Sequence, residues 1–186
     1  MRLTLPTMLT LFRIALLPVM VVVFYAGFRG ANIAASAVFI AAAITDWLDG
    51  WIARRYGMYS KFGEFLDPVA DKLMVATTLF LLVQDNPTIP LAIMAAVIVG
   101  REITISALRE WMAEIGERTR VGVAGIGKIK TIAQLVALVV LLYQKDLDGY
   151  GLFHVGEVLL GLAAALTIWS GVVYLRAAWP ALMEKG

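Results

Sequence analysis

The sequence contains no cysteine, a single histidine and few charged residues. The absence of cysteine excludes a disulfide framework, a thiolate nucleophile and a Cys-based zinc site. The one histidine, His154, lies near the outer end of an apolar segment, and we assign it no chemistry. Charged residues make up only 16% of the 186 positions, whereas hydrophobic residues make up 61%. This composition argues against a soluble core and is typical of a polytopic membrane protein.

Six apolar segments account for most of the chain. They fall at 5–28, 32–56, 64–84, 88–112, 122–144 and 155–180, and each is near the ~20 residues that a helix needs to cross the hydrocarbon layer. Alternation with period two is absent, and lipid exposure permits only helices or closed barrels. No charged stretch and cleavage site precede the first segment, so we expect it to be retained. We predict an all-α integral membrane protein in which 1–186 form one domain of six transmembrane helices.

The distribution of lysine and arginine predicts the orientation of these helices. If the N-terminus is cytoplasmic, only Arg29 and Lys145, two of the 16 basic residues, fall on the outer side. Basic residues concentrate on the cytoplasmic side of membrane proteins. We therefore expect both termini, and the stretch from Asp46 to Asp71, to face the cytoplasm.

Four aspartates lie within this short stretch, in a chain that is otherwise poor in charge. Asp46 and Asp49 are three residues apart and Asp67 and Asp71 four apart, so each pair lies on one face of its helix. The short connection between the two helices predicts antiparallel neighbours, on which all four carboxylates converge. Carboxylate oxygens select hard cations, and four aspartates have enough charge for two ions such as Mg²⁺ or Mn²⁺. Two such ions favour a phosphate ester or pyrophosphate as substrate.

The other residues of the stretch agree with a phosphate site. Gly50 and Gly63 have no side chain and would let a ligand approach the backbone. Ala53 follows Asp49 by one turn and keeps that face open, and Arg54 suits a phosphate oxygen.

Two further interpretations of charged side chains stay open. The carboxylates could instead be neutralised in a buried structural network by Arg54, Arg101 and Lys72. In the first helix Thr10 and Arg13 share a face. Arg13 either snorkels to the interface or lines the site, and Thr10 is a candidate for donor binding.

The acidic stretch also matches a longer pattern. It reads Asp46-x2-Asp49-Gly50-x2-Ala53-Arg54-x8-Gly63-x3-Asp67-x3-Asp71. At all eight fixed positions, and in their spacing, it resembles the signature of the CDP-alcohol phosphotransferase family. The segments Gly100-Arg101-Glu102-x4-Ala107-Leu108-Arg109-Glu110-Trp111 and Gly127-Lys128-Ile129-Lys130-Thr131 look like the bacterial phosphatidylglycerophosphate synthase branch of that family. Thr7 stands where many relatives carry asparagine.

The resemblance implies a fold, a reaction and a location. The fold is a bundle of six transmembrane helices, usually homodimeric, with a polar cavity open to the cytoplasm. The donor is CDP-diacylglycerol, the acceptor sn-glycerol 3-phosphate, and the products phosphatidylglycerol phosphate and CMP. We accordingly expect a multi-pass protein of the bacterial cytoplasmic (inner) membrane, in contact with membrane lipids and with no nucleic-acid partner.

The resemblance also implies roles for individual residues. One metal would be held by Asp46, Asp49 and Asp67, and the other by Asp46, Asp67 and Asp71. The binding site for CDP would be lined by Asp49, Gly50, Ala53, Arg54, Gly63 and Asp67. Asp71 would be the general base.

An anionic acceptor needs cations, and the second half of the chain supplies them. Arg101 and Arg109 lie eight residues apart on one stripe of the fourth predicted helix. Lys128 and Lys130 open the fifth predicted helix, and Arg118 precedes it. For several of these cations anchoring at the interface or contact with anionic lipid is the alternative.

Other functions fit parts of the same pattern. Within the family the acceptor could be inositol phosphate, serine or a second phosphatidylglycerol. The cations favour a phosphorylated acceptor over serine. From a different class, the carboxylates could line the path of a divalent-cation transporter, although Glu157 is an isolated acid toward the far side. A membrane prenyltransferase would need a second aspartate-rich cluster, and the sequence has only one.

Overall fold

Six helices make up the structure, a computed structural model that describes residues 4–116, 124–143 and 150–185. They are α1 (Leu5–Tyr25), α2 (Ala31–Tyr56), α3 (Lys61–Asp85), α4 (Ile89–Glu114), α5 (Ala124–Tyr143) and α6 (Tyr150–Lys185). In these residues there is no strand. The predicted all-α class and the six predicted helices are therefore confirmed.

Four of these helices are long and apolar enough to cross a membrane, by length and composition, within the described ranges. They are α1, α2, α4 and the part of α6 from Gly151 to Pro180. Charged residues such as Asp67, Asp71 and Lys72 interrupt the sequence of α3, and the described apolar part of α5 is the shorter Ile129–Tyr143. The chain is an all-α integral membrane protein, in which α3 brings charge among apolar helices.

The N-terminal end of α3 differs from the prediction. The apolar pattern begins at residue 64, whereas the helix begins at Lys61 because the Ser60 hydroxyl caps it by accepting a hydrogen bond from the Gly63 amide at 3.0 Å. Such a cap satisfies one of the free amides of the first turn. The charged first turn of α3 is thereby held close to the start of α1.

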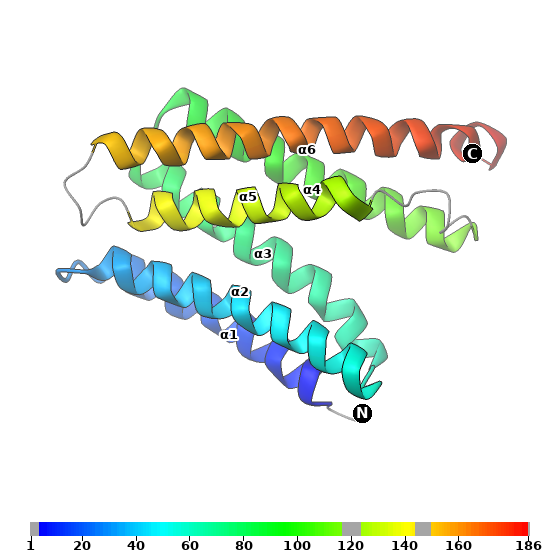
Figure 1. The fold of residues 1–186 in the computed structure, drawn as a ribbon, viewed down its shortest axis with the longest axis horizontal. Helices are drawn as coiled ribbons and strands as arrows, with labels where there is room; N and C mark the ends of the chain where they lie inside the picture. The colour runs from blue at the N-terminus through cyan, green and yellow to red at the C-terminus, as the bar shows by residue number, and fades with distance from the viewer. Residues whose placement is uncertain (1–3, 117–123, 144–149, 186) are drawn as a thin grey trace.

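The helices form two groups that meet along the bundle (Figure 1). Helix α1 packs against α2 and α3, and α6 packs against α4 and α5. Contacts of α2 with α5, and of α3 with α4, join the groups. Both ends of the chain lie toward the same end of the bundle (Figure 1).

The expected pairing of the second and third helices is the main correction. Helices α2 and α3 touch only slightly, and α1 packs extensively on both of them. A short connection brings the ends of two helices together but leaves the angle between their axes free. The two pairs of aspartates are therefore brought together by the packing of both helices on α1 and not by extensive packing of α2 on α3.

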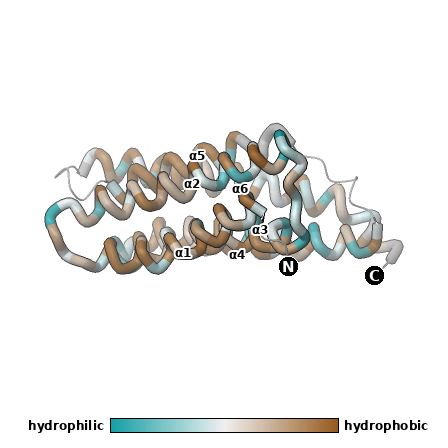
Figure 2. Tube along the Cα trace, turned by 90° about the horizontal axis from the view of Figure 1, so that it is seen from below, coloured by the Kyte–Doolittle hydropathy of each residue, from teal (hydrophilic) through white to brown (hydrophobic). Residues whose placement is uncertain are grey.

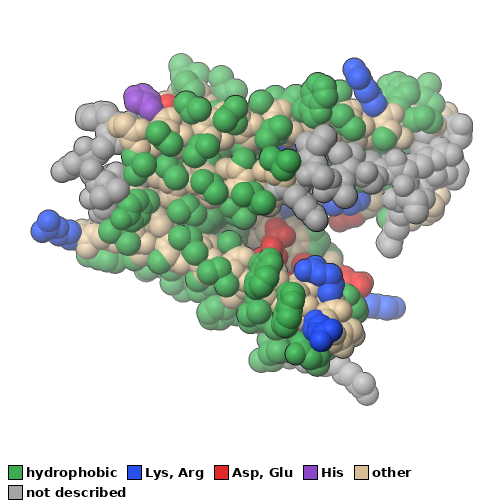
Figure 3. All heavy atoms as spheres, viewed as in Figure 1, with side chains coloured by type: hydrophobic (Ala, Val, Ile, Leu, Met, Phe, Trp, Pro, Cys, Tyr) green, Lys and Arg blue, Asp and Glu red, His purple; other side chains and the backbone are tan. Residues whose placement is uncertain are grey.

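One hydrophobic core extends through the bundle. Its buried members come from all six helices and include Met20, Phe39, Leu79, Ile98, Leu138 and Leu160. Hydrophobic residues predominate along the middle of the helices (Figure 2), and large apolar side chains such as Trp47 and Phe80 are exposed on the outside. In Figure 3 hydrophobic side chains cover most of the visible face, and acidic side chains show between the two groups of helices. An apolar exterior of this extent suits contact with lipid.

Candidate functional site

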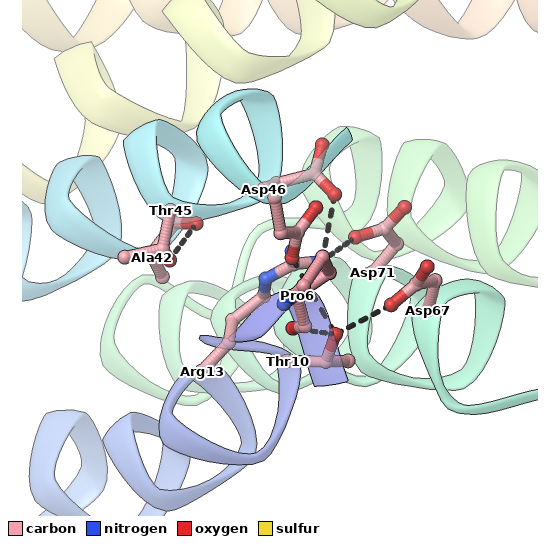
Figure 4. Close-up of polar contacts among 9 residues, drawn as sticks. Pro6, Thr10, Arg13, Ala42, Thr45, Asp46, Asp67 and Asp71 are labelled. Carbon is pink, nitrogen blue, oxygen red and sulfur yellow. Dashed lines mark hydrogen bonds and ion pairs between the residues drawn. The ribbon is translucent and has the colours of Figure 1, made fainter. Parts of the chain in front are cut away.

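A single arginine of α1 organises the carboxylates of α2 and α3. Arg13 is 1% exposed, and its Nη1 lies 2.7 Å from Asp46 Oδ1 and 2.5 Å from Asp71 Oδ1. Its Nη2 forms an ion pair with Asp49 Oδ2. Figure 4 shows Arg13, Asp46 and Asp71 pointing toward one another from three helices. Of the two interpretations of Arg13, the structure supports lining of the site over snorkelling.

The fourth carboxylate, that of Asp67, is bound by Thr10, which lies on α1 one turn before Arg13. The buried Thr10 hydroxyl donates a hydrogen bond to Asp67 Oδ1 at 2.5 Å. Its oxygen also lies 3.5 Å from Asp49 Oδ2 and 3.1 Å from the Pro6 carbonyl oxygen. Thr10 and Arg13 are thus the two residues of α1 on which all four aspartates converge. Figure 4 shows three of these aspartates, Asp46, Asp67 and Asp71.

The cluster has a closed end and an open end. The Asp49 side chain is 4% exposed, whereas those of Asp46 and Asp71 are 46% and 51% exposed. A cavity of about 110 Å³ adjoins the cluster and is lined by Arg13, Asp46, Asp71 and Thr131 among other residues. The Asp46 and Asp71 carboxylates are therefore accessible to a molecule that enters from this side.

The donor set suits hard metal ions. Four carboxylates face one guanidinium, so the cluster keeps an excess of negative charge in apolar surroundings. Carboxylate oxygens are the ligands that Mg²⁺ and Mn²⁺ prefer. Among the residues that the structure describes, no three acidic or histidine side chains are grouped closely enough to hold an ion as they stand. Arg13 lies between the carboxylates and pairs with three of them.

From the sequence, Arg54, Arg101 and Lys72 were the alternative partners that could neutralise these aspartates in a buried network. The structure shows no ion pair from Arg54, Arg101 or Lys72 to the four carboxylates, within the described part of the chain. The exposed Arg54 instead lies over Gly50, where a Cβ atom would be 3.2 Å from Arg54 Nη1. Gly50 thus makes room for Arg54. Ala53 lies next to Arg54 on the same helix and is half-buried.

Gly63 lies where the first turns of α1 and α3 contact each other. A Cβ atom there would be 2.9 Å from Thr7 Oγ1 and 3.0 Å from Ser60 Oγ. The buried Thr7 hydroxyl is hydrogen-bonded to Ser60 Oγ at 2.6 Å and to Thr4 Oγ1 at 2.8 Å. Thr7, which stands in the asparagine position of the family pattern, therefore ties the start of α1 to the cap of α3. In this structure Gly63 serves helix packing.

A second polar cavity also borders α3. It has a volume of about 520 Å³, and α3, α4 and α6 line it. Its charged lining residues are three cations, Lys72, Arg101 and Arg109, and three acids, Glu64, Glu102 and Glu110. Pro68 and Lys72, which line it, directly follow Asp67 and Asp71 in the chain, so the cavity adjoins the helix that carries two of the four aspartates.

The two arginines of this cavity belong to α4 and donate hydrogen bonds to side chains of α6. Arg101 Nη2 donates to Ser170 Oγ at 2.9 Å, and Arg109 Nε donates to the Tyr174 hydroxyl at 3.3 Å. The Arg109 guanidinium also lies 5.4 Å from the centre of the Tyr174 ring, a cation–π distance. A Cβ atom at Gly171 would be 3.3 Å from Arg101 Cγ, so that glycine keeps the place of Arg101 open.

An acidic residue links two of the predicted acceptor cations. Glu102 Oε1 forms an ion pair with the buried Lys130 and lies 3.4 Å from Arg101 Nη1. The Lys72 ammonium donates a hydrogen bond to Ser106 Oγ in the same region. The structure thus brings Arg101, Arg109 and Lys130 into one neighbourhood. Arg118 and the side chain of Lys128 lie outside the described residues.

Sequence reasoning missed some residues of the second cavity and its surroundings. Ser170 and Tyr174 belong to an apolar helix more than 60 positions after their partners, and no local pattern singles them out. Glu102 and Lys72 were visible as charges inside apolar segments, and that signal could have placed them in the cavity.

An apolar groove of about 350 Å³ opens between α2 and α5. It is lined only by hydrophobic side chains, among them Ile40, Trp47 and Val136. It shares Phe39, Ala43 and Leu135 with the small cavity beside the aspartates. The apolar groove therefore adjoins the cavity beside the polar cluster.

Comparison with known proteins adds independent information. A protein-family model described as CDP-alcohol phosphatidyltransferase matches residues 3–169. A CDP-diacylglycerol--glycerol-3-phosphate 3-phosphatidyltransferase of Yersinia pestis (strain Pestoides F) is 48% identical over 184 residues, 99% of this chain and 100% of that protein. Proteins of the same name from Sodalis glossinidius and Salmonella choleraesuis are 48% and 46% identical, each again over its full length.

The packing at Gly63 generates a testable prediction. Gly63→Ala should lower the melting temperature in detergent, because the new methyl group collides with Thr7 Oγ1 and overpacking costs about 1–3 kcal/mol. Adding Thr7→Ala, which removes that oxygen, should restore part of the loss. The control is Gly100→Ala, since a Cβ atom there meets nothing within 4 Å. An unchanged melting temperature for Gly63→Ala would show that this glycine serves ligand approach and not packing.

Proposed function

Because the chain belongs to the CDP-alcohol phosphatidyltransferase family, we propose a mechanism in which its two polar clusters receive the two substrates. The enzyme transfers the phosphatidyl group of CDP-diacylglycerol to sn-glycerol 3-phosphate, and CMP leaves. The observation that carries the mechanism is the placement of the acidic cluster and of the second polar cavity beside the same helix, α3. We call this cavity the cationic cavity after Lys72, Arg101 and Arg109, the three cations that line it together with three acids. Metal-bound diphosphate on one side and an anionic acceptor on the other would meet there.

Members of this family use divalent metal ions, and we assign two, Mg²⁺ or Mn²⁺, to the four aspartates. Asp46, Asp49 and Asp67 would hold one, and Asp46, Asp67 and Asp71 the other. When bound, the ions neutralise the charge that develops on the diphosphate oxygens and on the departing CMP. The exposed fractions of Asp46 and Asp71 support this assignment, since their oxygens are open to a ligand.

Asp71 is the base of the proposed reaction. The acceptor hydroxyl oxygen attacks the phosphorus that bears the diacylglycerol, a new P–O bond forms, and the P–O bond to CMP breaks. The hydroxyl proton passes to the Asp71 carboxylate. Asp71 suits this task because its side chain is half exposed and lies on the helix that borders the cationic cavity.

The cationic cavity would hold the phosphate of the acceptor. Arg109 is fixed by Tyr174 and Arg101 by Ser170, so their guanidinium groups are oriented before a ligand arrives. Lys130 is buried nearby and shares Glu102 with Arg101. Charge-assisted bonds of this kind are the strong ones for phosphate. Arg118 and Lys128 stay candidates on sequence grounds.

The lipid part of the donor accounts for the apolar groove. Removing an acyl chain from lipid costs about 0.8 kcal/mol per CH₂, so the donor has to react while its chains stay in an apolar environment. The groove between α2 and α5 adjoins the cavity at Asp46 and Asp71, with which it shares three lining residues. We assign it to an acyl chain of the donor. The CDP moiety would lie against Thr10, Asp49, Gly50, Ala53, Arg54, Gly63 and Asp67.

The proposed orientation follows from the charge distribution. Both termini and the acidic cluster would face the cytoplasm, in the inner membrane of a bacterium, and the protein would act as a homodimer. The end of the bundle that carries both termini (Figure 1) is compatible with this arrangement.

A divalent-cation transporter is the alternative from a different class. Such a path would need acids along the depth of the bundle. Glu157 is close to His154, with Glu157 Oε2 3.6 Å from His154 Nδ1, near the start of α6 and far along the chain from the aspartates. The observation therefore favours an enzyme.

A comparison of three acceptor alcohols tests the proposed function. Purified protein in detergent, given CDP-diacylglycerol and Mg²⁺, should release CMP with sn-glycerol 3-phosphate and much more slowly with serine or inositol phosphate. Uptake of Mn²⁺ into sealed vesicles without CMP release would instead support the transporter. Faster release with inositol phosphate would keep the family but change the acceptor.

The role of Asp71 predicts a specific kinetic defect. Asp71→Asn should lower kcat by about 10²- to 10⁴-fold, while the KM for CDP-diacylglycerol changes only a few-fold, because the donor keeps its other contacts. The measurement is made at saturating Mn²⁺, so that a weakened metal site does not limit the rate. Normal turnover would remove Asp71 from the role of base.

The cationic cavity predicts the opposite kinetic pattern. Arg109→Gln and Lys130→Ala should each raise the KM for sn-glycerol 3-phosphate by about tenfold, since each loses a charge-assisted bond of about 1.5–3 kcal/mol, with a smaller change for the donor. Arg176→Gln, an exposed arginine of α6, is the matched control. Unchanged acceptor kinetics in both variants would place the acceptor elsewhere.

A further inference from the structure

Arg13 has no task in the transfer as described above. It is the only charged residue in the sequence of α1, and it is almost completely buried. Buried charges are expensive unless they are paired, and here the pairing is unusually extensive. The position therefore calls for its own explanation.

The bonding of Arg13 connects three helices. Its Nη1 lies between Asp46 Oδ1 of α2, at 2.7 Å, and Asp71 Oδ1 of α3, at 2.5 Å. Its Nη2 pairs with Asp49 on α2. Its Nε is buried and has no hydrogen-bond partner. One side chain of α1 thus serves aspartates on both α2 and α3, which touch each other only slightly.

The carboxylates that Arg13 holds are the same ones that the metal ions would need. A guanidinium and a divalent cation are attracted by the same oxygens, and both cannot occupy the space between them. We propose that Arg13 is a positioning residue, a built-in counter-cation that holds Asp46, Asp49 and Asp71 together before metal binds and then competes with the metal for them. This inference rests on the proposed function, because it takes the aspartates to be metal ligands.

Two observations support competition over a purely structural ion pair. A structural pair needs one partner, whereas Arg13 is shared by three carboxylates, two of them half exposed and open to a ligand. The Thr10 contacts to Asp67 and Asp49 provide a separate link between α1 and the cluster. Asp49 on α2 and Asp67 on α3 therefore keep an attachment to α1 when Arg13 gives way.

The consequence can be measured as metal affinity. In Arg13→Gln the carboxylates lose their resident cation, so Mn²⁺ should bind about tenfold more tightly, within the range typical of coupled sites. The melting temperature in EDTA should fall, and saturating Mn²⁺ should raise it more than in the native protein. Binding is followed by the electron paramagnetic resonance signal of Mn²⁺ on chelator-treated protein in detergent. The matched control, Arg55→Gln at the exposed end of α2, should leave all three quantities unchanged.

The outcomes separate this inference from the metal site itself. If the native protein binds no Mn²⁺, the proposed metal site is wrong and competition fails with it, whereas the EDTA comparison still tests whether Arg13 holds the helices. If the native protein binds Mn²⁺ and Arg13→Gln binds it equally or more weakly, the competition is wrong. If Arg13→Gln does not fold, Arg13→Lys is measured in its place. Lysine keeps the charge but has fewer hydrogen-bond donors, so this variant should bind Mn²⁺ more tightly than the native protein. Equal or weaker binding would overturn the inference.

Discussion

The attraction between one buried guanidinium and the carboxylates of two other helices determines how the N-terminal half of this protein is arranged. Like charges gathered among apolar helices repel one another, and the repulsion is strong where the effective dielectric constant is low. Arg13 relieves it by pairing with Asp46, Asp49 and Asp71. Because these aspartates belong to α2 and α3, the same pairing draws both helices onto α1.

The C-terminal half also pairs buried and half-buried charges of opposite sign. There Glu102 is the acid among cations, paired with Lys130 and close to Arg101. In the acidic cluster one residue of opposite charge keeps the aspartates together and leaves a surplus that suits metal ions. The second cavity is lined by equal numbers of cations and acids, and the buried Lys130 lies nearby as a further cation. Its arginines are oriented by α6 toward a phosphate ligand, and α3 borders both the cavity and the acidic cluster.

Much of the fold and part of the candidate site could be predicted from local sequence. Apolar runs of membrane-spanning length predict helices because the backbone must satisfy its own hydrogen bonds in lipid, and six helices are present. The spacing within Asp46–Asp49 and within Asp67–Asp71 predicts one face for each pair, since helical geometry is local. The neighbours of those faces could not be predicted. Helix α1 packs between α2 and α3, and a short connection says nothing about a third helix entering between the two that it joins.

The sequence by itself determined the class of the fold, the family and the residues able to bind hard cations, because apolar length and aspartate spacing are properties of short segments. Only the tertiary structure decided which cation neutralises the carboxylates. Arg54 is close to them in sequence, yet Arg13 holds them from 36 and 58 positions away. Which cation pairs with the aspartates depends on which side chain is buried beside them when whole helices pack. Leaving a buried charge unpaired is costly, so the cation that is buried there has to pair with them.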